Sequence, residues 1–436
     1  MKLSGSPVRM PLQARNTKKS YAMNKITSII ILALIFVSCS GPAKNNKNNK
    51  NNKEMATDST RQYGYNRNFL KKYTSVIELK NKNSALLLAP AWQGRVMTST
   101  SEGDNGFSFG WINHGLISSR KSLAHINPFG GEERLWLGPE GGQYAIFFSK
   151  GKEFTFENWQ TPDFIDTKPY EVSALTDSSA TFTSSVAIEN YSGTLFKLDI
   201  ERKVILLSDN EILKQTGINT SGLNCVAYRS MNTITNKGKD VWKKESGLLS
   251  VWMLGMFNPS PAVVVVIPVR EGVEKEYGLK VNDNYFGKIS SDRLRVEGTH
   301  VFFKADGKSR GKIGIPPLRA KSILGSYDSE NKILTLLFCT LPDGVKDYVN
   351  SSWQIQDNPF SGDAFNSYND GPLDNGTQMG PFYELETSSP AAALAPDKSM
   401  THSQITLHLT GDIDHLDKVA LQVLGVSLEK IGKAFK

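Results

Sequence analysis

The segment Leu195-Phe196-Lys197-Leu198-Asp199-Ile200-Glu201 alternates apolar with polar side chains, so that Phe196, Leu198 and Ile200 share one face. A period of two is typical of a strand with one buried and one solvated face. Residues 181–188, which precede this segment in the chain, alternate in the same way. The two segments therefore predict half-buried antiparallel strands.

Residues 263–267 and 333–338 are apolar on both faces and predict central strands of a sandwich. Helical periodicity is weak at residues 68–73 and clearest after Asp414, where a C-terminal helix is expected to pack on a sheet. No repeat of about 20 to 50 residues is visible, which argues against a propeller or a solenoid. The sequence predicts one all-β domain over residues 63–436, a large antiparallel β-sandwich with few short helices.

The N-terminal region has the pattern of a bacterial lipoprotein signal. Nine apolar residues, 29–37, follow a charged start at Met23-Asn24-Lys25 and precede Cys39. This apolar run is too short to span a bilayer but fits a secretory signal. We predict a signal region at residues 1–39, with a true start at Met23 and lipidation at Cys39.

Residues 40–62 are rich in Asn and Lys and predict a solvated tether. The chain carries a formal net charge of +8, from 51 Lys and Arg against 43 Asp and Glu. Residues 1–60 hold ten of the basic and two of the acidic residues, which leaves 51 − 10 = 41 basic against 43 − 2 = 41 acidic. A neutral folded part argues against a nucleic-acid partner. The expected location is the cell envelope, anchored by lipid on the periplasmic side or at the cell surface.

Cys225 and Cys339 both lie in apolar surroundings, which favours buried inert thiols, although an exported protein could also pair them. No Cys or His spacing typical of a zinc site is present. No phosphate-binding glycine loop is present either.

Residues 127–142 form a block that looks like a site rather than a scaffold. The block holds three glutamates, Arg134 and Trp136 between glycine pairs. Arg134 alternates with apolar neighbours, which predicts a strand that brings its guanidinium to one rim, where it would suit a hydroxyl-bearing ligand. A Ca²⁺ site is an alternative use of the carboxylates, because they are hard oxygen donors; the four candidates are Glu132, Glu133, Glu140 and Asp370. Their spacing matches no known calcium-binding loop. We therefore predict no metal and no cofactor.

A second block spans residues 368–390. Within it Glu384 and Glu386 lie two apart on an expected strand and would face the same way. The plain alternative is that these two glutamates form the solvated side of the strand.

The two blocks resemble the galactose mutarotase-like superfamily. The residues that carry the resemblance are Gly-Gly-x-x-Arg-x-Trp-x-x-Pro-Glu at residues 130–140, Gly94-Arg95-Val96, and Leu385-Glu386-Thr387. The chain also looks like an uncharacterised branch of lipoproteins from the Bacteroides group. The likeness extends loosely over residues 76–409. It implies a β-supersandwich with a concave, carbohydrate-binding face.

In aldose epimerases of that superfamily a glutamate in a Leu-Glu-Thr stretch is the general base, and Glu386 matches that position. The partner acid is a histidine in mid-chain, and residues 230–236 hold no histidine. His125 loosely matches another active-site histidine of the family, and a satisfied loop histidine is an equal reading of it. The resemblance therefore implies Glu386 and His125 as catalytic residues, while the mid-chain histidine that mutarotation uses is missing.

All seven tryptophans lie in the predicted folded part, and sugar rings dock on such side chains. Trp242, flanked by lysines, is predicted to be an exposed platform, whereas Trp252 lies in an apolar run and is predicted to be buried. The full set of predicted substrate-binding residues is Glu132, Arg134, Trp136, Asn232, Trp242, Asn369 and Asp370.

Three kinds of function fit these residues. An epimerase-like isomerase predicts that Glu386 and a second acid–base group meet in one pocket. A non-catalytic glycan-binding lipoprotein predicts an aromatic groove without that pair. A polysaccharide lyase or glycoside hydrolase on the same sandwich predicts several acids, or a Tyr/His pair, along a cleft.

Overall fold

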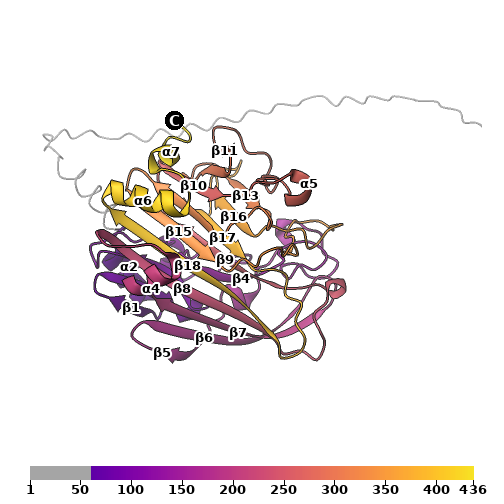
Figure 1. Cartoon of the computed structure of the whole chain (residues 1–436). Coiled ribbons are helices and arrows are strands. Elements are labelled where there is room, and N and C mark those ends of the chain that lie inside the picture. Colours follow the sequence, from indigo (N-terminus) through magenta and orange to yellow (C-terminus); the bar gives the residue numbers. More distant parts are fainter. Residues whose placement is uncertain (1–59) are drawn as a thin grey trace, which may run out of the picture. The chain divides into compact units, whose positions relative to one another are not determined.

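The computed structural model describes residues 60–436. The predicted signal region, Cys39 and most of the tether lie outside the described residues. Within residues 60–436 the chain forms eighteen strands, which pair antiparallel into three sheets (Figure 1). The prediction of a large antiparallel β-sandwich is confirmed.

The largest sheet has ten strands and contains the segments predicted from sequence. Its strands, in spatial order, are β11 (Leu294–Glu297), β12 (His300–Lys304), β10 (Val263–Pro268), β14 (Ile323–Asp328), β15 (Ile333–Cys339), β18 (Ser399–Gly411), β8 (Leu223–Asn236), β7 (Leu195–Leu206), β6 (Ser179–Glu189) and β5 (Glu171–Leu175). Strands β6 and β7 pair antiparallel, and Phe196, Leu198 and Ile200 are buried as expected. Strands β10 and β15 are interior strands, also as expected.

A five-stranded sheet packs against this large sheet, and its labels follow one another in Figure 1. Its strands are β13 (Gly311–Ile315), β16 (Phe365–Asn369), β17 (Tyr383–Ser388), β9 (Ser250–Phe257) and β4 (Arg134–Gly138). A third sheet contains β1 (Ile77–Asn81), β2 (Ser84–Ala89) and β3 (Arg95–Thr100), and a bridge between Val96 and Glu133 ties it to the start of β4.

Helices are few and short, as predicted. In the described residues they are α2 (Tyr63–Tyr73), α3 (His114–Ser119), α4 (Asp209–Thr216), α5 (Glu274–Tyr277), α6 (Ile413–Val423) and α7 (Leu428–Gly432). Asp412 caps α6 by accepting hydrogen bonds from two backbone N–H groups of the first turn. The buried face of α6 packs with Leu334 and Leu407 of the large sheet, which confirms the predicted contact. None of the helices described here is long and apolar enough to cross a membrane.

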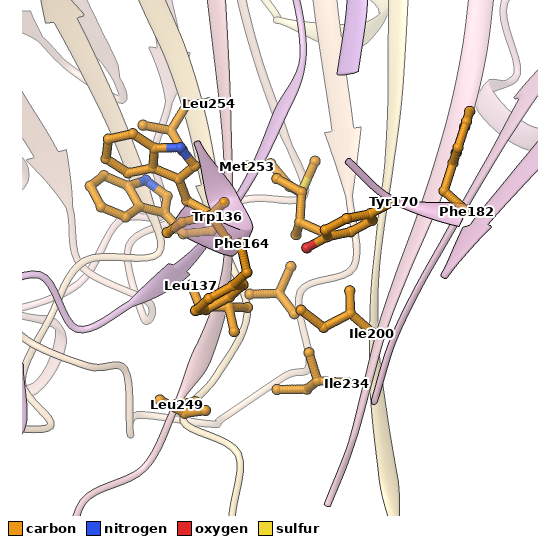
Figure 2. Close-up of a cluster of buried hydrophobic side chains, with 14 of the residues drawn as sticks. Trp136, Leu137, Phe164, Tyr170, Phe182, Ile200, Ile234, Leu249, Met253 and Leu254 are labelled. Atoms are coloured by element: carbon orange, nitrogen blue, oxygen red, sulfur yellow. The ribbon is translucent and has the colours of Figure 1, made fainter. Parts of the chain in front are cut away.

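The core between the sheets fixes which side of the five-stranded sheet is free for a site. Met253 lies toward Ile200 of the large sheet, whereas Trp136 and Leu254 lie on the other side of β4 and β9 (Figure 2). Because side chains alternate between the two faces along each strand, the other residues of the sheet can be assigned to one face or the other in the same way. We call the side away from the ten-stranded sheet the outer face.

Both cysteines of the described chain are free thiols, so the alternative of a disulfide between them is excluded in this structure. Cys225 lies on β8 and Cys339 on β15. Burial raises the pKa of each thiol, which keeps both protonated and inert at neutral pH.

Candidate functional site

The outer face carries four charged side chains that strand register brings together. Glu384 and Glu386 lie two apart on β17, as predicted, and therefore point the same way. Glu386 stands opposite Leu254 of β9, and Arg134 of β4 stands opposite the same leucine. Lys312 of β13 stands opposite Tyr368, which in turn stands opposite Glu384. We call Arg134, Lys312, Glu384 and Glu386 the outer-face group.

Glu386 is held through one of its two carboxylate oxygens. Its Oε2 accepts a hydrogen bond from the indole Nε1 of Trp252 at 2.8 Å and one from the Lys312 ammonium at 3.0 Å. The side chain is fully buried, and its Oε1 has no partner among the described residues. A buried carboxylate oxygen without a donor is costly unless another group binds it, so Oε1 is a natural acceptor for a ligand hydroxyl.

Glu384 forms a buried ion pair with Arg134, whose guanidinium lies 5.1 Å from the centre of the Trp136 ring. Burial raises the pKa of Glu384 to about 7, and the nearby Glu386 carboxylate adds to the rise although Arg134 opposes it. Glu384 therefore holds a proton more readily than an ordinary glutamate, despite its ion pair.

Lys312 is the central cation of the site. Burial alone would lower its pKa, but the carboxylates of Glu386, Glu140 and Glu384 outweigh burial and raise the pKa above its ordinary value. Its ammonium also lies 4.8 Å from the ring of Trp252 and 5.6 Å from that of Tyr285. Lys312 is thus a permanent charge rather than a proton acceptor near pH 7.

Beside Lys312, Tyr285 donates a 2.6 Å hydrogen bond to Oδ2 of Asp363 and accepts one from the amide of Asn366 at 3.0 Å. Burial raises the pKa of Asp363 to about 6, although its hydrogen bonds oppose the rise. Gly314 makes room for this arrangement, because a Cβ there would come within 1.9 Å of the Asp363 carboxylate and 2.9 Å of the Tyr285 hydroxyl. The pair therefore depends on a glycine in β13.

An aromatic wall borders the β4 side of the outer face. Trp136 contacts Phe147 with ring centres 5.4 Å apart, and Phe147 stacks on Trp159 at 5.8 Å. Glu140, just after β4, has its pKa raised to about 6 by burial, with Lys312 and the indole of Trp353 opposing the rise. Within residues 60–436, the Nε atom of Arg134 and the indole nitrogen of Trp136 lack hydrogen-bond partners.

The structure brings four of the predicted site residues to this face: Glu386, Arg134, Trp136 and, at the end of β16, Asp370, whose carboxylate also acts on Glu384. His125 lies in a loop, where its Nδ1 donates to the Trp159 carbonyl at 2.7 Å and its ring packs on Phe156. These contacts match the reading of His125 as a satisfied loop histidine.

Asn232 and Glu132 are fully buried in the interior rather than on the outer face. Asn232 on β8 accepts a 2.7 Å hydrogen bond from Arg202, whose guanidinium also binds Glu133 at 2.8 Å. Glu132 accepts from the backbone N–H of Ser99 at 2.9 Å. Both side chains bind other residues of the interior, a role that residue type alone does not distinguish from ligand binding.

Asn369 and Asp370 end strand β16. Asn369 accepts from the Gly307 backbone at 2.8 Å, and Asp370 accepts from the Tyr368 hydroxyl at 2.8 Å. Burial raises the pKa of Asp370. Both side chains hold neighbouring backbone and the Tyr368 ring in place.

The expectation that Trp242 is an exposed platform is wrong. Its side chain is 5% exposed and packs edge-on against Phe196, with ring centres 5.2 Å apart. Flanking lysines predicted exposure, but the indole packs inward onto strand β7. Trp252, at 6% exposure, is buried as predicted.

No cluster of three or more His, Cys, Asp or Glu side chains suited to a metal ion occurs in residues 60–436. The four acids considered for Ca²⁺ have different partners: a backbone amide for Glu132, Arg202 for Glu133, and the Tyr368 hydroxyl for Asp370. Glu140 interacts instead with the outer-face group.

Sequence reasoning missed Lys312, Tyr285 and Asp363. Lys312 lies in a strand of only five residues, and its cross-strand partners come from parts of the chain far away in sequence. The Gly-Lys-Ile-Gly-Ile alternation at residues 311–315 was the one available signal, since it places the lysine between residues of the opposite face.

Two surface cavities, of about 410 and 330 Å³, lie elsewhere in the fold. One is lined by residues that include Tyr277 and Lys346, the other by residues that include Arg295 and Lys433. Both have linings rich in long charged side chains, and neither includes a member of the outer-face group.

Comparison with known proteins identifies a family. A model described as "Family of unknown function (DUF6786)" matches residues 61–435. No curated protein matches the chain.

Among solved structures, a putative aldose 1-epimerase from Escherichia coli K12 is 12% identical, with a TM-score of 0.45, and the match covers 78% of this chain and 99% of that one. A galactose mutarotase-like protein from Lactobacillus casei ATCC 334 is 11% identical, with a TM-score of 0.46, over 77% of this chain and 100% of that one. The Slr1438 protein from Synechocystis sp. PCC 6803 is 12% identical, with a TM-score of 0.46, over 78% and 96%.

Proposed function

The chain belongs to the DUF6786 family, whose function is unknown, and we propose that it binds carbohydrate on the outer face of its five-stranded sheet and acts on the anomeric centre by acid–base chemistry. The observation that carries this proposal is the pair Glu384 and Glu386, two buried carboxyls on one strand in different electrostatic environments. Glu386 is ion-paired with Lys312 and also bound by the Trp252 indole, whereas Glu384 is ion-paired with Arg134 and has its pKa raised to about 7, chiefly by burial. Two carboxyls whose environments differ in this way suit one base and one acid.

In the proposed reaction Glu386 accepts the proton of the anomeric hydroxyl. The C1–O5 bond of the sugar breaks, its electron pair stays on the ring oxygen, and a carbonyl forms at C1. The protonated Glu384 gives its proton to the ring oxygen. After rotation of the carbonyl the reverse steps close the ring with the opposite configuration, and both carboxyls regain their starting state. Each such group contributes about 10²- to 10⁴-fold when properly placed.

Binding would use polar atoms that have no partner among the described residues. Oε1 of Glu386 can accept from a sugar hydroxyl, while Nε of Arg134 and the indole N–H of Trp136 can each donate to one. The sequence resemblance of the Leu385-Glu386-Thr387 stretch to aldose epimerases supports the assignment of Glu386 as the base. Lys312 and Trp252 are positioning residues, because they hold Oε2 and leave Oε1 without a donor among the described residues.

Proton NMR of freshly dissolved single anomers of D-glucose, D-galactose and D-mannose tests the reaction with the purified full chain. We expect faster anomer exchange that falls about 100-fold in Glu386→Gln and declines above about pH 7, as Glu384 loses its proton. Glu171→Gln, at an exposed carboxylate of β5, is the matched control. Exchange at the uncatalysed rate with the wild-type chain would rule out the proposed reaction for these sugars.

Glycan binding without turnover is the second candidate, and the ion pairs favour it. Each carboxyl of the pair already has a cationic partner, Arg134 for Glu384 and Lys312 for Glu386. If these pairs persist with ligand bound, proton transfer is suppressed and the face acts as a recognition surface. Line broadening of sugar signals without anomer exchange would identify this case.

A lipid-anchored location in the cell envelope completes the proposal. It is supported by the apolar run before Cys39, the Asn- and Lys-rich segment after it, and the formal neutrality of the remaining chain. An enzyme or receptor for sugars held at the envelope would meet its ligand before uptake.

A further inference from the structure

Two exposed aromatic rings stand at opposite ends of the outer face. Trp353 is 36% exposed, stacks on Trp159 with ring centres 5.9 Å apart, and meets Phe148 edge-on at 5.1 Å. Through Trp159 and Phe147 it continues the aromatic wall that begins at Trp136 on β4. Its indole also acts on the carboxylate of Glu140, which interacts with Lys312 and Glu386. Trp353 is therefore next to the outer-face group on its β4 side.

Phe286 marks the other end. It is 49% exposed, and its ring lies edge-on to Tyr368 at 5.9 Å. The guanidinium of Arg310 lies 3.9 Å from the ring centre, which orients the ring and adds donors beside it. Tyr368 projects from β16 directly opposite Glu384 of β17. Phe286 is therefore next to the outer-face group on its β16 side.

The separation of the two rings follows from the order of the strands. Between β16 and β4 lie β17 and β9, so three strand spacings, about 14 Å in all, separate the two strands beside which the rings lie. A single pyranose ring at Glu386 cannot reach both. Exposed aromatic rings beside polar side chains offer an apolar face to the C–H groups of a sugar and hydrogen-bond partners to its hydroxyls.

We propose that the outer face takes an oligosaccharide chain rather than a lone sugar, with Phe286 and Trp353 as platforms for rings on either side of the one at Glu386. This inference rests on the proposed function, because it assumes that the outer-face group holds a sugar. The oligosaccharide would run across the strands, from β13 and β16 to β4. Its hydroxyls would meet the polar side chains between the two platforms. Sugar rings dock their C–H faces on aromatic faces while polar neighbours bind the hydroxyls.

Isothermal titration calorimetry with the full chain tests this inference on matched sugars of increasing length: glucose, cellobiose and cellohexaose; glucose, maltose and maltohexaose; and xylose, xylobiose and xylohexaose. For at least one series we expect affinity to rise about tenfold or more from the monosaccharide to the hexasaccharide. Phe286→Ala and Trp353→Ala are each expected to reduce that gain several-fold. Tyr65→Ala, an aromatic on α2 that is 41% exposed, is the matched control and is expected to keep the gain.

The outcomes separate the inference from the proposal beneath it. Binding that does not strengthen with chain length, or a gain that both platform variants retain, would overturn the oligosaccharide inference and leave the proposed function standing. Absence of binding for every sugar in all three series would contradict both. Circular dichroism of each variant checks that a lost gain does not come from unfolding.

Discussion

The carboxylate of Glu386 shows how much a single side chain depends on its partners. It is fully buried, and the only cation in direct contact with it among the described residues is Lys312, whose own side chain is 12% exposed. A buried charge that loses its partner is far more costly than the pair itself is stabilising. The free energy of unfolding should therefore respond strongly to the loss of either partner in the Lys312–Glu386 pair.

We expect Lys312→Met to lower the free energy of unfolding by about 3 kcal/mol, because it leaves a buried carboxylate with only the Trp252 indole as donor. The double variant Lys312→Met with Glu386→Gln should be less destabilised than the sum of the single variants, because no unpaired charge remains. Urea denaturation at pH 7 measures all four states of the cycle. Strict additivity would show that the two side chains are not coupled.

The raised pKa of Glu384 predicts a dependence of stability on pH. Because the folded state binds this proton more tightly than the unfolded chain, the stability gained is full below pH 4.5 and is lost as the pH rises through about 7. The loss approaches about 1.4 kcal/mol per pH unit within that window. His402 acts in the opposite direction, since burial lowers its pKa to about 4.

Comparison with a variant isolates the contribution of Glu384 from that of His402. In Glu384→Gln the free energy of unfolding should decline less between pH 5 and pH 7 than in the wild type, as measured by urea denaturation at several pH values. Glu171→Gln should keep the wild-type slope. Equal slopes in the wild type and in Glu384→Gln would mean that Glu384 titrates at an ordinary pKa.

At the scale of elements, strand β13 is the part of the site most dependent on its exact sequence. Gly314→Ala would place a Cβ 1.9 Å from the Asp363 carboxylate and should displace the Asp363–Tyr285 pair, at a cost of about 1 to 3 kcal/mol. Gly311→Ala on the same strand is the matched control, because its Cβ would come no closer than 3.3 Å to the flexible Ile289 side chain and 3.6 Å to the Phe303 ring. Urea denaturation compares the two variants. Equal stabilities would show that the pair adjusts without cost.

The strands were predictable where the apolar pattern is strong. The site was predictable only one strand at a time, because the sequence does not show which strands are neighbours. Alternation gave β6 and β7, continuous apolar runs gave β10 and β15, and the spacing of Glu384 and Glu386 gave their shared face. The pattern does not state which strands are neighbours. Lys312 reaches Glu386 only because β13 joins the sheet beside β16, a long-range pairing that local sequence does not encode.

Burial was the other step that local sequence could not give. Trp242 has charged neighbours yet packs on Phe196, and Asn232 lies in a polar block yet binds Arg202 inside the sandwich. In both cases the side chain points inward because its partner, Phe196 or Arg202, comes from a segment that is distant in the sequence. Residue type shows what a side chain can bind, and tertiary packing decides what it does bind.

At the scale of the whole molecule, the sequence divides into residues 1–60, which carry the whole formal net charge of +8, and a formally neutral remainder. A neutral domain has no strong electrostatic attraction to anionic lipid. Residence at a membrane would then depend on covalent lipid, and a lipidated residue needs more than one acyl chain for stable anchoring. Cys39 is the residue at which the sequence predicts that attachment.

Metabolic labelling with an alkynyl fatty acid, in a bacterial host that expresses the full chain, tests this attachment. We expect label on the wild type and on Cys225→Ser, whose altered residue is an inert thiol of the folded domain, and none on Cys39→Ser. Mass spectrometry of the wild type should find an N-terminal peptide that starts at an acylated Cys39. A mature protein that keeps an unmodified Cys39 would contradict the lipid anchor and leave the proposed sugar site on the outer face to be tested separately.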